Sequence, residues 1–453
     1  MQNFAVFIPF LAFLITITCF ILLIYRLIYT FFLDDKSIKK DINQINKEQR
    51  DKEIVKRLNY LNSPITNFKF YQNISILIDF LPFLLINRAS IFISNYVFYI
   101  LENENKTSGL NILREIWGKW DTVNYLAIAQ NWYQGQGDER FLIVFYPLYP
   151  VTISIFNKII NDYFLSGIIV SNIFLVLSLY YIYKLVLIEF QKKEIAFNTA
   201  KYMLLFPLSF FFSIVYTESL FIYLCIMTFY FARKKRWLSA GIMGFFAALT
   251  RSQGILLVIP LLIEILYEYR DLKYQIKSKS NHRKRRNLMS LRTIVSLLLI
   301  PCGTFTYLLI NKLVSGNWLM FLTYQKEHWG QNLGFFTENL KNSFISIFTM
   351  NKVMAVNVWI PHIFLFFMGF GLLIYTVNKI RLSYTAFSFF YIIISYSPTW
   401  ALSAPRYITG MFTLFIMLAL LVNEYKYLEK YLDFILAILL CFYSIQFSLS
   451  RVF

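Results

Sequence analysis

The sequence predicts an all-α integral membrane protein, a bundle of helices that crosses the bilayer many times. Of its 453 residues, 58% are hydrophobic and only 15% are charged, which is far more apolar than an ordinary soluble chain. Apolar runs long enough to cross a bilayer recur, the clearest at 4–33 and 74–101. The basic residues gather in short segments between such runs, as they do in the cytoplasmic loops of membrane proteins.

The formal net charge of +19 would suggest a nucleic-acid ligand in a soluble protein. Here the positive charge lies between apolar runs, beside an anionic membrane leaflet, so the bilayer is the expected partner and nucleic acid is not. The four cysteines have no CxxC spacing and the chain has only three histidines. The sequence therefore supports neither a disulfide framework nor a metal site.

The chain divides into three predicted parts. Residues 1–33 form an extra N-terminal transmembrane helix, which we expect to be retained because it lacks a basic start and is longer than a signal-peptide core. Residues 34–72 form a charged cytoplasmic connector, either an amphipathic helix on the membrane or a solvated linker. Residues 73–453 form the main transmembrane domain, with outer loops near 102–160 and 315–352.

Charge bias fixes the predicted sidedness, because segments rich in Lys and Arg stay in the cytoplasm. This gives about twelve spans, within a range of ten to thirteen. The predicted spans are 4–33, 74–101, 163–188, 195–215, 217–232, 237–251, 254–269, 293–313, 353–377, 383–400, 406–423 and 431–450. Residues 141–160 are apolar but are interrupted by Pro147 and Pro150, so we expect a re-entrant or interfacial segment there.

The stretch from Trp117 to Ala129 carries the strongest chemistry on the predicted outer side. Asp121 lies there among tryptophans, where partial removal from water can keep a carboxylate basic enough to take a hydroxyl proton. We therefore expect Asp121 to act as a general base. The structural alternative is that Asp121 caps a helix beginning at Thr122 and the tryptophans form an interface belt. The two interpretations are compatible.

Three further lone charges lie between apolar helices on the same predicted side. An ionisable group in or near the membrane is a functional hypothesis by default. Glu218 could bind sugar hydroxyls or hold an arginine in place. Arg251 and Arg406 could bind a phosphate, since a guanidinium stays charged when it is desolvated. The structural alternative is an ion pair between Glu218 and one of the two arginines.

The segment from Gly316 to Gly330 combines aromatic rings with polar side chains. Gln325, His328 and Trp329 are residue types that hold a sugar ring, by stacking on its apolar face and by hydrogen bonds to its hydroxyls. An interfacial helix anchored by tryptophans is the alternative. The sequence has no Walker A, HExxH or GxGxxG motif, which argues against a nucleotide-driven pump and a zinc protease.

Several motifs follow one another along residues 74–422. They are Trp120-Asp121 with Tyr125 and Ile128-Ala129, Pro147-Leu148-Tyr149-Pro150, Tyr216-Thr217-Glu218-Ser219-Leu220-Phe221, Thr250-Arg251-Ser252-Gln253-Gly254, the segment from Gly316 to Trp329, and Pro405-Arg406-Tyr407. In this order they resemble the PIG-V family of mannosyltransferases, known from GPI-anchor assembly and from bacterial relatives.

The resemblance implies a helical bundle of the GT-C glycosyltransferase type, which takes a sugar from a polyprenyl phosphate on the outer or luminal face. It implies inverting transfer of a hexose, expected to be mannose, to an extracytoplasmic glycan or glycolipid acceptor. Asp121 would be the base, and the two arginines would stabilise the leaving phosphate. Trp120, Tyr125 and Gln253 would line the substrate site.

The sequence also departs from the family pattern. It carries the extra first helix and connector, and Gln253 stands where many eukaryotic members have Asn. Its richness in Asn, Lys, Ile and Phe and the lack of an ER signal favour a bacterial plasma membrane, with the ER membrane as the alternative. We expect no cofactor beyond the lipid-linked donor, and no divalent metal. The alternative function is a transporter or flippase of lipid-linked sugars, although charged motifs at helix ends on one face favour the enzyme.

Overall fold

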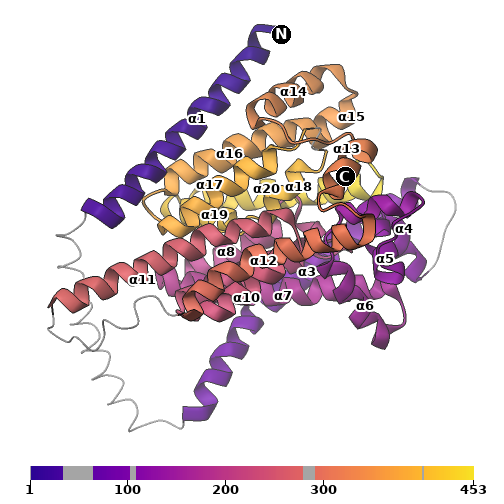
Figure 1. Ribbon diagram of the computed structural model, residues 1–453. Helices are drawn as coiled ribbons and strands as arrows, with labels where there is room; N and C mark the ends of the chain where they lie inside the picture. The colour runs from indigo at the N-terminus through magenta and orange to yellow at the C-terminus, as the bar shows by residue number, and fades with distance from the viewer. Residues whose placement is uncertain (1, 34–64, 103–108, 279–290, 400–401, 453) are drawn as a thin grey trace.

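The computed structural model describes residues 2–33, 65–102, 109–278, 291–399 and 402–452 (Figure 1). These residues are 83% helical and contain no β-strand, which confirms the predicted all-α class. The predicted connector falls outside the described residues from 34 to 64. Its last residues, 65–72, belong to helix α3, which begins at Ile65, and the connector itself stays a prediction.

The α-helices, in chain order, are α1 (Gln2–Ile28), α3 (Ile65–Glu102), α4 (Leu110–Trp117), α5 (Asp121–Asn131), α6 (Leu148–Ile160), α7 (Tyr163–Phe190), α8 (Lys193–Leu205), α9 (Glu218–Arg233), α10 (Trp237–Ala248), α11 (Val258–Ser278), α12 (Leu291–Ser315), α13 (Met320–Trp329), α14 (Phe336–Thr349), α15 (Lys352–Met354), α16 (Ile360–Thr376), α17 (Leu382–Tyr396), α18 (Ala404–Tyr407), α19 (Thr413–Glu424) and α20 (Leu428–Ser448). The 3-10 and π segments are η1 (Tyr29–Leu33), η2 (Asp138–Val144), η3 (Ser209–Phe212), η4 (Ser252–Leu257), η6 (Ala355–Trp359) and η7 (Ile408–Gly410).

Seven helices in the described ranges are long and apolar enough to cross a bilayer. They are Phe7–Phe31, Phe80–Glu102, Tyr163–Phe190, Ser252–Asp271, Leu291–Ser315, Lys352–Thr376 and Leu428–Ser448. The bent pair η2 and α6 would make an eighth, and α10, α17 and α19 are shorter apolar helices. The chain is thus an integral membrane protein, as expected. The count of about twelve spans stays a prediction.

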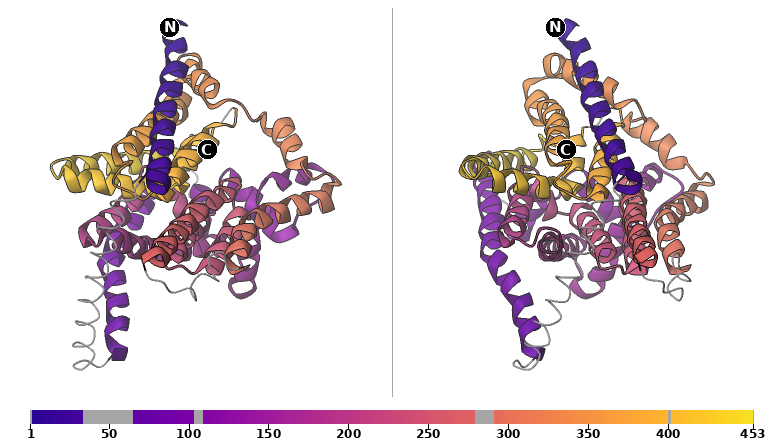
Figure 2. Two further views of the ribbon diagram at one scale, coloured as in Figure 1. Left: turned by 60° about the vertical axis from the view of Figure 1, so that its left-hand side comes forward. Right: turned by 90° about the vertical axis from the view of Figure 1, so that its left-hand side faces the viewer.

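The bundle packs closely where α10 crosses α12. A Cβ on Gly241 would come within 2.5 Å of the Ser296 carbonyl oxygen, and a Cβ on Gly303 within 2.3 Å of the Phe245 carbonyl oxygen. Glycine on each helix therefore lets the two backbones approach, as small residues do between membrane helices. Figure 2 shows the long first helix α1 at the edge of the bundle, and α1 packs on α14, α16 and α17.

The predicted span 195–215 is wrong as a single helix. Helix α8 ends at Leu205, and a buried irregular segment, 206–217, follows it. Pro207 has no N–H to continue a helical ladder. Side chains instead supply hydrogen bonds to backbone carbonyls here: Ser209 Oγ donates to the Leu204 carbonyl at 2.5 Å, and Asn172 Nδ2 donates to the Ser213 carbonyl at 3.0 Å. Irregular backbone at membrane depth needs such partners, and this segment leads directly to Glu218.

Residues 141–160 form a break rather than a straight span. The axes of η2 and α6 are bent by 109° across residues 145–147. Pro147 is the N-cap of α6, and Pro150 lies in its first turn, where a missing N–H costs little. The prolines therefore produce the predicted interruption. The geometry is that of a broken span or a re-entrant loop.

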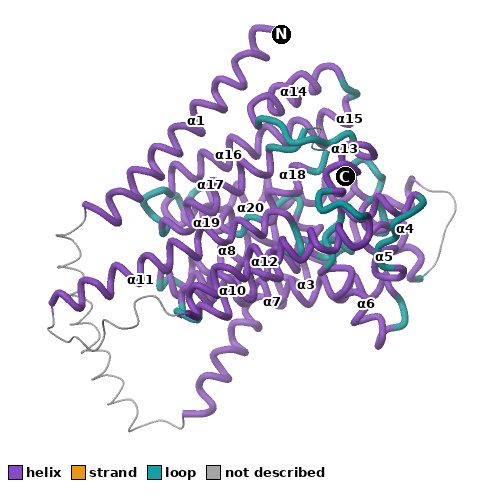
Figure 3. Tube along the Cα trace, in the orientation of Figure 1, coloured by secondary structure: helices purple, strands orange, loops and turns teal. Residues whose placement is uncertain are grey.

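The short helices α4, α5, α6 and α13 lie at one end of the bundle. Figure 1 shows α4, α5 and α6 at the right, with α13 and the C-terminus nearby, whereas the end of α11 lies at the left. Several loops, drawn in teal in Figure 3, run around α5, α13 and the C-terminus. This end therefore holds α5 and α13, which belong to two of the segments to which the sequence analysis assigned chemical roles.

Candidate functional site

Asp121 is the first residue of α5, at the end of the bundle where the short helices gather. Its Oδ2 accepts a 2.8 Å hydrogen bond from Nη2 of Arg406. The capping alternative is corrected by the structure: Trp120 is the N-cap and no side chain bonds the free amides there. Because Asp121 lies one position inside the helix, its carboxylate points to the distant Arg406 instead of its own backbone.

The backbone just before Asp121 is strained. Trp120 has φ 54° and ψ −122°, a combination that residues with a Cβ rarely adopt. Such conformations cost of order 1–3 kcal/mol and persist only where surrounding contacts hold them, most often at functional sites. The strain turns the chain sharply between α4 and α5 and leaves the Trp120 ring 38% exposed.

Arg406 links two carboxylates from different parts of the chain. It lies in the short helix α18 and is 5% exposed. Its Nη2 binds Asp121, and its Nε lies 3.2 Å from Oε1 of Glu218. The guanidinium also lies over the rings of Tyr216 and Phe211, at 4.8 and 5.4 Å from their centroids. Cation–π contacts of this kind hold a desolvated cation in place.

Glu218 is the centre of the cluster and is fully buried. Its Oε1 is shared between Arg406 and Arg251, whose Nη1 lies 2.5 Å away. The same Nη1 donates to Thr217 Oγ1 at 3.1 Å. Glu218 begins α9, so the N-terminal end of the helix dipole also favours its negative charge. The structural alternative was a single ion pair between Glu218 and one arginine, whereas the structure has two ion pairs on the same Glu218 oxygen.

Asp121, Glu218, Arg251 and Arg406 thus form one carboxylate–guanidinium cluster with two charges of each sign. Three buried atoms of the cluster, Glu218 Oε2 and both Nε and Nη1 of Arg406, have no hydrogen-bond partner among the described residues, although Nε lies within ion-pair distance of Glu218. A buried polar atom left unpaired costs about 1–3 kcal/mol and calls for an explanation.

Asp121 is the most open member of the cluster. Its side chain is 22% exposed, against 0% for Glu218, 6% for Arg406 and 9% for Arg251. Arg406 holds Oδ2, whereas Oδ1 accepts no hydrogen bond from any described residue. The cluster therefore leaves Oδ1 of Asp121 without a hydrogen-bond partner among the described residues, on a side chain that is partly exposed.

Tyr125 forms the aromatic wall beside this carboxylate. Its ring is edge-on to Phe145, Tyr149 and Tyr216, with centroids 5.2, 5.4 and 6.1 Å apart. Burial, with a smaller effect of Asp121, raises the pKa of its hydroxyl above the ordinary value. Tyr125 therefore stays neutral and packs the site.

The predicted residues of α13 lie one layer further out. His328 stacks on Phe141 at 4.5 Å, and Trp329 meets Phe145 at 5.8 Å. Gln325 is hydrogen-bonded to Gln331. Helix α13 thus rests on η2 and reaches Tyr125 through Phe145. Within the described part of the chain, no hydrogen bond or ion pair joins these three residues to the charged cluster.

Gln253 and Lys119 each lie two residues from a member of the charged cluster in the sequence. Gln253 lies in η4, is 6% exposed, and accepts a hydrogen bond from Ser252. Lys119, which the sequence analysis did not select, donates to Ser450 Oγ at 2.8 Å, and its carbonyl accepts from Tyr216. Burial lowers the pKa of Lys119. Lys119 stands two residues before Asp121, and this closeness was the only hint of a role. Its partner Ser450 cannot be inferred from the residues around Lys119, because it lies near the other end of the chain.

No group of three or more His, Cys, Asp or Glu able to hold a metal ion occurs in the ranges the structure describes. The prediction that no divalent metal takes part stays a prediction.

Comparison with protein-family models matches residues 146–282 to the dolichyl-phosphate-mannose-protein mannosyltransferase family. The match covers α6 to α11 and includes Glu218 and Arg251, whereas Asp121 and Arg406 lie outside it. A comparison with curated proteins finds no match. Over less than a third of its length, then, this membrane protein is similar to mannosyltransferases of the GT-C type, which points to a glycosyltransferase that uses a polyprenyl-phosphate sugar.

Proposed function

We propose that this protein transfers a hexose, which we take to be mannose, from a polyprenyl phosphate to a hydroxyl of an extracytoplasmic glycan or glycolipid. The family match over residues 146–282 supports the donor class. The observation that carries the proposal is the geometry of Asp121, whose Oδ2 is held by Arg406 while Oδ1 is open. A general base needs a fixed, reachable atom of this kind.

In the proposed step the acceptor hydroxyl gives its proton to Oδ1 of Asp121. Its oxygen attacks the anomeric carbon of the donor sugar, and the new C–O bond forms as the bond from that carbon to the phosphate oxygen breaks. The bonding electrons leave with the polyprenyl phosphate. One displacement of this kind inverts the anomeric configuration.

We assign different tasks to the two arginines. Arg406 has a buried Nη1 without a partner, so a phosphate oxygen beside it would satisfy that nitrogen while charge builds on the leaving group. Arg251 donates its hydrogen bonds to Glu218 and Thr217. Its task is to hold Glu218, which in turn positions Arg406.

The other predicted residues fit around this centre in two layers. The exposed Trp120 ring adjoins Asp121 and offers a stacking surface for the reacting sugar, while Tyr125 forms the wall beside it. Gln325, His328 and Trp329 lie on the outer layer over η2, where they would contact the acceptor. Gln253 is buried in η4, two residues after Arg251.

The charge distribution supports an outward-facing site. Helix α9 begins at Glu218 and ends at Arg233, and Lys234 to Arg236 follow at once. Sixteen residues of helix place this basic cluster about 24 Å along the axis from the carboxylate. If the cluster stays in the cytoplasm, Asp121 faces the other side. We propose a bacterial plasma membrane, with the ER membrane as the alternative.

The decisive experiment uses purified protein in proteoliposomes with radiolabelled polyprenyl-phosphate mannose and a glycolipid extract of the host. Asp121→Asn is compared with Asp138→Asn, a matched control because Asp138 is an exposed carboxylate on η2. We expect labelled product from the wild type and from Asp138→Asn, and a loss of at least 10²-fold in Asp121→Asn.

Folding of each variant is checked by thermal unfolding, so that a loss of product reports on chemistry. Equal turnover by Asp121→Asn and the wild type would contradict the assignment of the base. Labelled donor that crosses the bilayer without forming product would instead favour a flippase of lipid-linked sugars.

A further inference from the structure

A cavity lies against the face of α5 that is opposite Asp121. It is bounded by α4, α5 and the start of α7 and has a volume of about 440 Å³, within the range of small-molecule sites. Asp121 and Gln130 are nine positions apart, which at 100° per residue puts them on opposite sides of the helix. The cavity is therefore separate from the charged cluster but shares its supporting helix.

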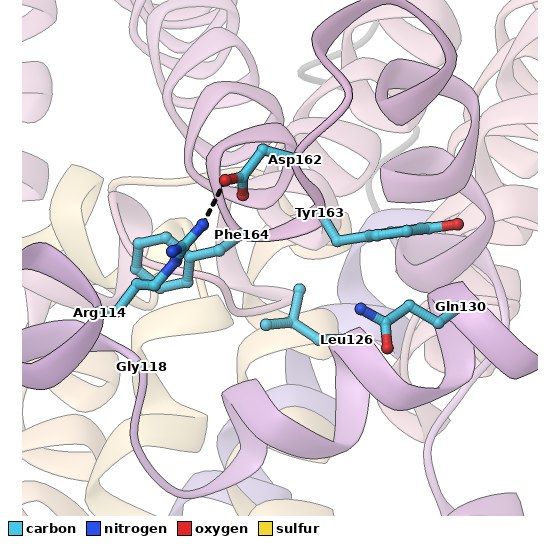
Figure 4. A pocket seen from close by; sticks show the side chains of 7 residues that line it. All are labelled: Arg114, Gly118, Leu126, Gln130, Asp162, Tyr163 and Phe164. Atoms are coloured by element: carbon cyan, nitrogen blue, oxygen red, sulfur yellow. Dashed lines mark hydrogen bonds and ion pairs between the residues drawn. The ribbon is translucent and has the colours of Figure 1, made fainter. Parts of the chain in front are cut away.

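The walls of the cavity combine apolar surfaces with polar groups on both sides. Figure 4 shows the Arg114–Asp162 ion pair on one side and Tyr163 with Gln130 on the other, with Leu126 between them. The Arg114 guanidinium lies 5.9 Å from the centroid of Phe164. A ligand here would meet hydrogen-bonding groups at its edges and an apolar side chain at its face.

The charges of this cavity are already balanced. Asp162 binds Arg114, and it also caps α7 by accepting from the Leu165 amide at 3.0 Å. The positive end of the α7 dipole and the guanidinium thus share one carboxylate. No net positive charge is left to attract a phosphate, so the cavity favours a neutral ligand.

The opposite wall offers unused hydrogen-bonding capacity. Neither the Gln130 amide nor the Tyr163 hydroxyl forms a hydrogen bond with any residue in the described ranges. An amide supplies donors and an acceptor, and a phenol does both. Together with Leu126, this set matches a hexose ring, which has hydroxyls around its rim and C–H groups on its face.

We propose that this cavity binds a neutral hexose unit of the acceptor glycan, one that does not itself react. Gly118, on the cavity wall, is only three residues from Asp121 and so its Cα lies within about 11 Å of that of Asp121. A glycan can therefore cross the 118–120 turn, with one sugar in the cavity and its reacting hydroxyl at Asp121. The role in acceptor binding rests on the proposed transferase function, whereas hexose binding itself does not.

The test is saturation-transfer NMR on the full chain in nanodiscs, with methyl hexosides and hexose trisaccharides and without donor. The double variant Gln130→Leu with Tyr163→Phe is compared with Gln136→Leu, an exposed glutamine in the 132–137 loop. We expect sugar signals from the wild type and from Gln136→Leu, and at least fivefold weaker signals from the double variant. Unchanged signals in the double variant, or displacement of the sugar by inorganic phosphate, would overturn the proposal.

Two further arms separate the possible outcomes. A glycolipid that competes where the free trisaccharide does not would identify the hexose as part of a lipid headgroup, and competition by both would identify a free glycan. A transfer assay on the same samples distinguishes the two proposals: sugar binding without turnover keeps the cavity and removes the transferase, whereas turnover with an unchanged KM for acceptor in the double variant removes the acceptor role.

Discussion

Glu218 is the residue on which the cluster depends, because one of its oxygens serves both arginines. Replacing it with Gln keeps the shape and removes the charge, which leaves Arg251 without a carboxylate in a buried place. Removing one partner of a buried pair costs about 3–5 kcal/mol. We expect Glu218→Gln to lower the melting temperature by several degrees and to abolish activity.

The control for this change is Glu338→Gln, which breaks the exposed pair of Glu338 and Lys341. Exposed pairs contribute about 0–1 kcal/mol, so its melting temperature should match the wild type. The double variant Glu218→Gln with Arg251→Met removes the stranded cation and should regain part of the lost stability. If Glu218→Gln and the wild type have the same melting temperature, the assignment of both arginines to one Glu218 oxygen is wrong.

Much of the charged cluster could be predicted from sequence, and the reason is its setting. Asp121, Glu218, Arg251 and Arg406 are lone charges at the ends of apolar runs, where a charge without a function or a partner would be costly. Sequence does not show which atoms meet, because Arg406 and Asp121 are 285 positions apart. The residues of the cavity beside α5, such as Gln130, were missed because an exposed polar residue on a short helix carries no signal alone.

At the scale of the elements, long apolar helices could be predicted and irregular segments could not. The predicted span 163–188 nearly matches the bounds of α7, because no proline interrupts this apolar run. Residues 206–215 were assigned to the span 195–215 because they are as apolar as a helix. Their backbone is satisfied by Ser209 and Asn172, contacts that hydropathy does not contain.

Close packing of α10 on α12 makes a prediction at this scale. In Gly241→Ala the new methyl group would lie 2.5 Å from the Ser296 carbonyl oxygen and 2.7 Å from its Cα, so the two helices must separate. Overpacking of this kind costs about 1–3 kcal/mol, and we expect a lower melting temperature.

Gly371→Ala is the matched control, since a Cβ on Gly371 of α16 meets no heavy atom within 4 Å. Replacing a mid-helix glycine by alanine gains about 0.5–1 kcal/mol, so this variant should melt at or above the wild-type temperature. Equal melting of both variants would show that α10 and α12 do not touch at Gly241.

At the scale of the whole molecule, α9 connects two ion clusters of different character. At its end, Arg233 joins a closed cluster in which Glu264 accepts from Arg381 at 3.0 and 3.1 Å and from Ser383 at 2.6 Å. Both oxygens of Glu264 are thus filled. At its start, Glu218 and Arg406 each keep an unpaired atom, and Asp121 keeps an open oxygen. The first arrangement ties helices together, and the second is suited to receive a ligand.

The difference between the two ends of α9 predicts which side of the membrane each end of the helix faces. A single cysteine is introduced at exposed Gln136, near the site, or at exposed Arg236, after α9, in a background with Cys302→Ala and Cys441→Ala; Cys19 and Cys225 are buried. A membrane-impermeant maleimide should label Gln136→Cys from outside intact cells and Arg236→Cys only in inverted vesicles, because the basic cluster stays in the cytoplasm. Labelling of both from one side would contradict a crossing by α9. A reversed pattern would put Asp121 in the cytoplasm, where an extracytoplasmic acceptor could not reach it, and the proposed reaction would fail with the topology.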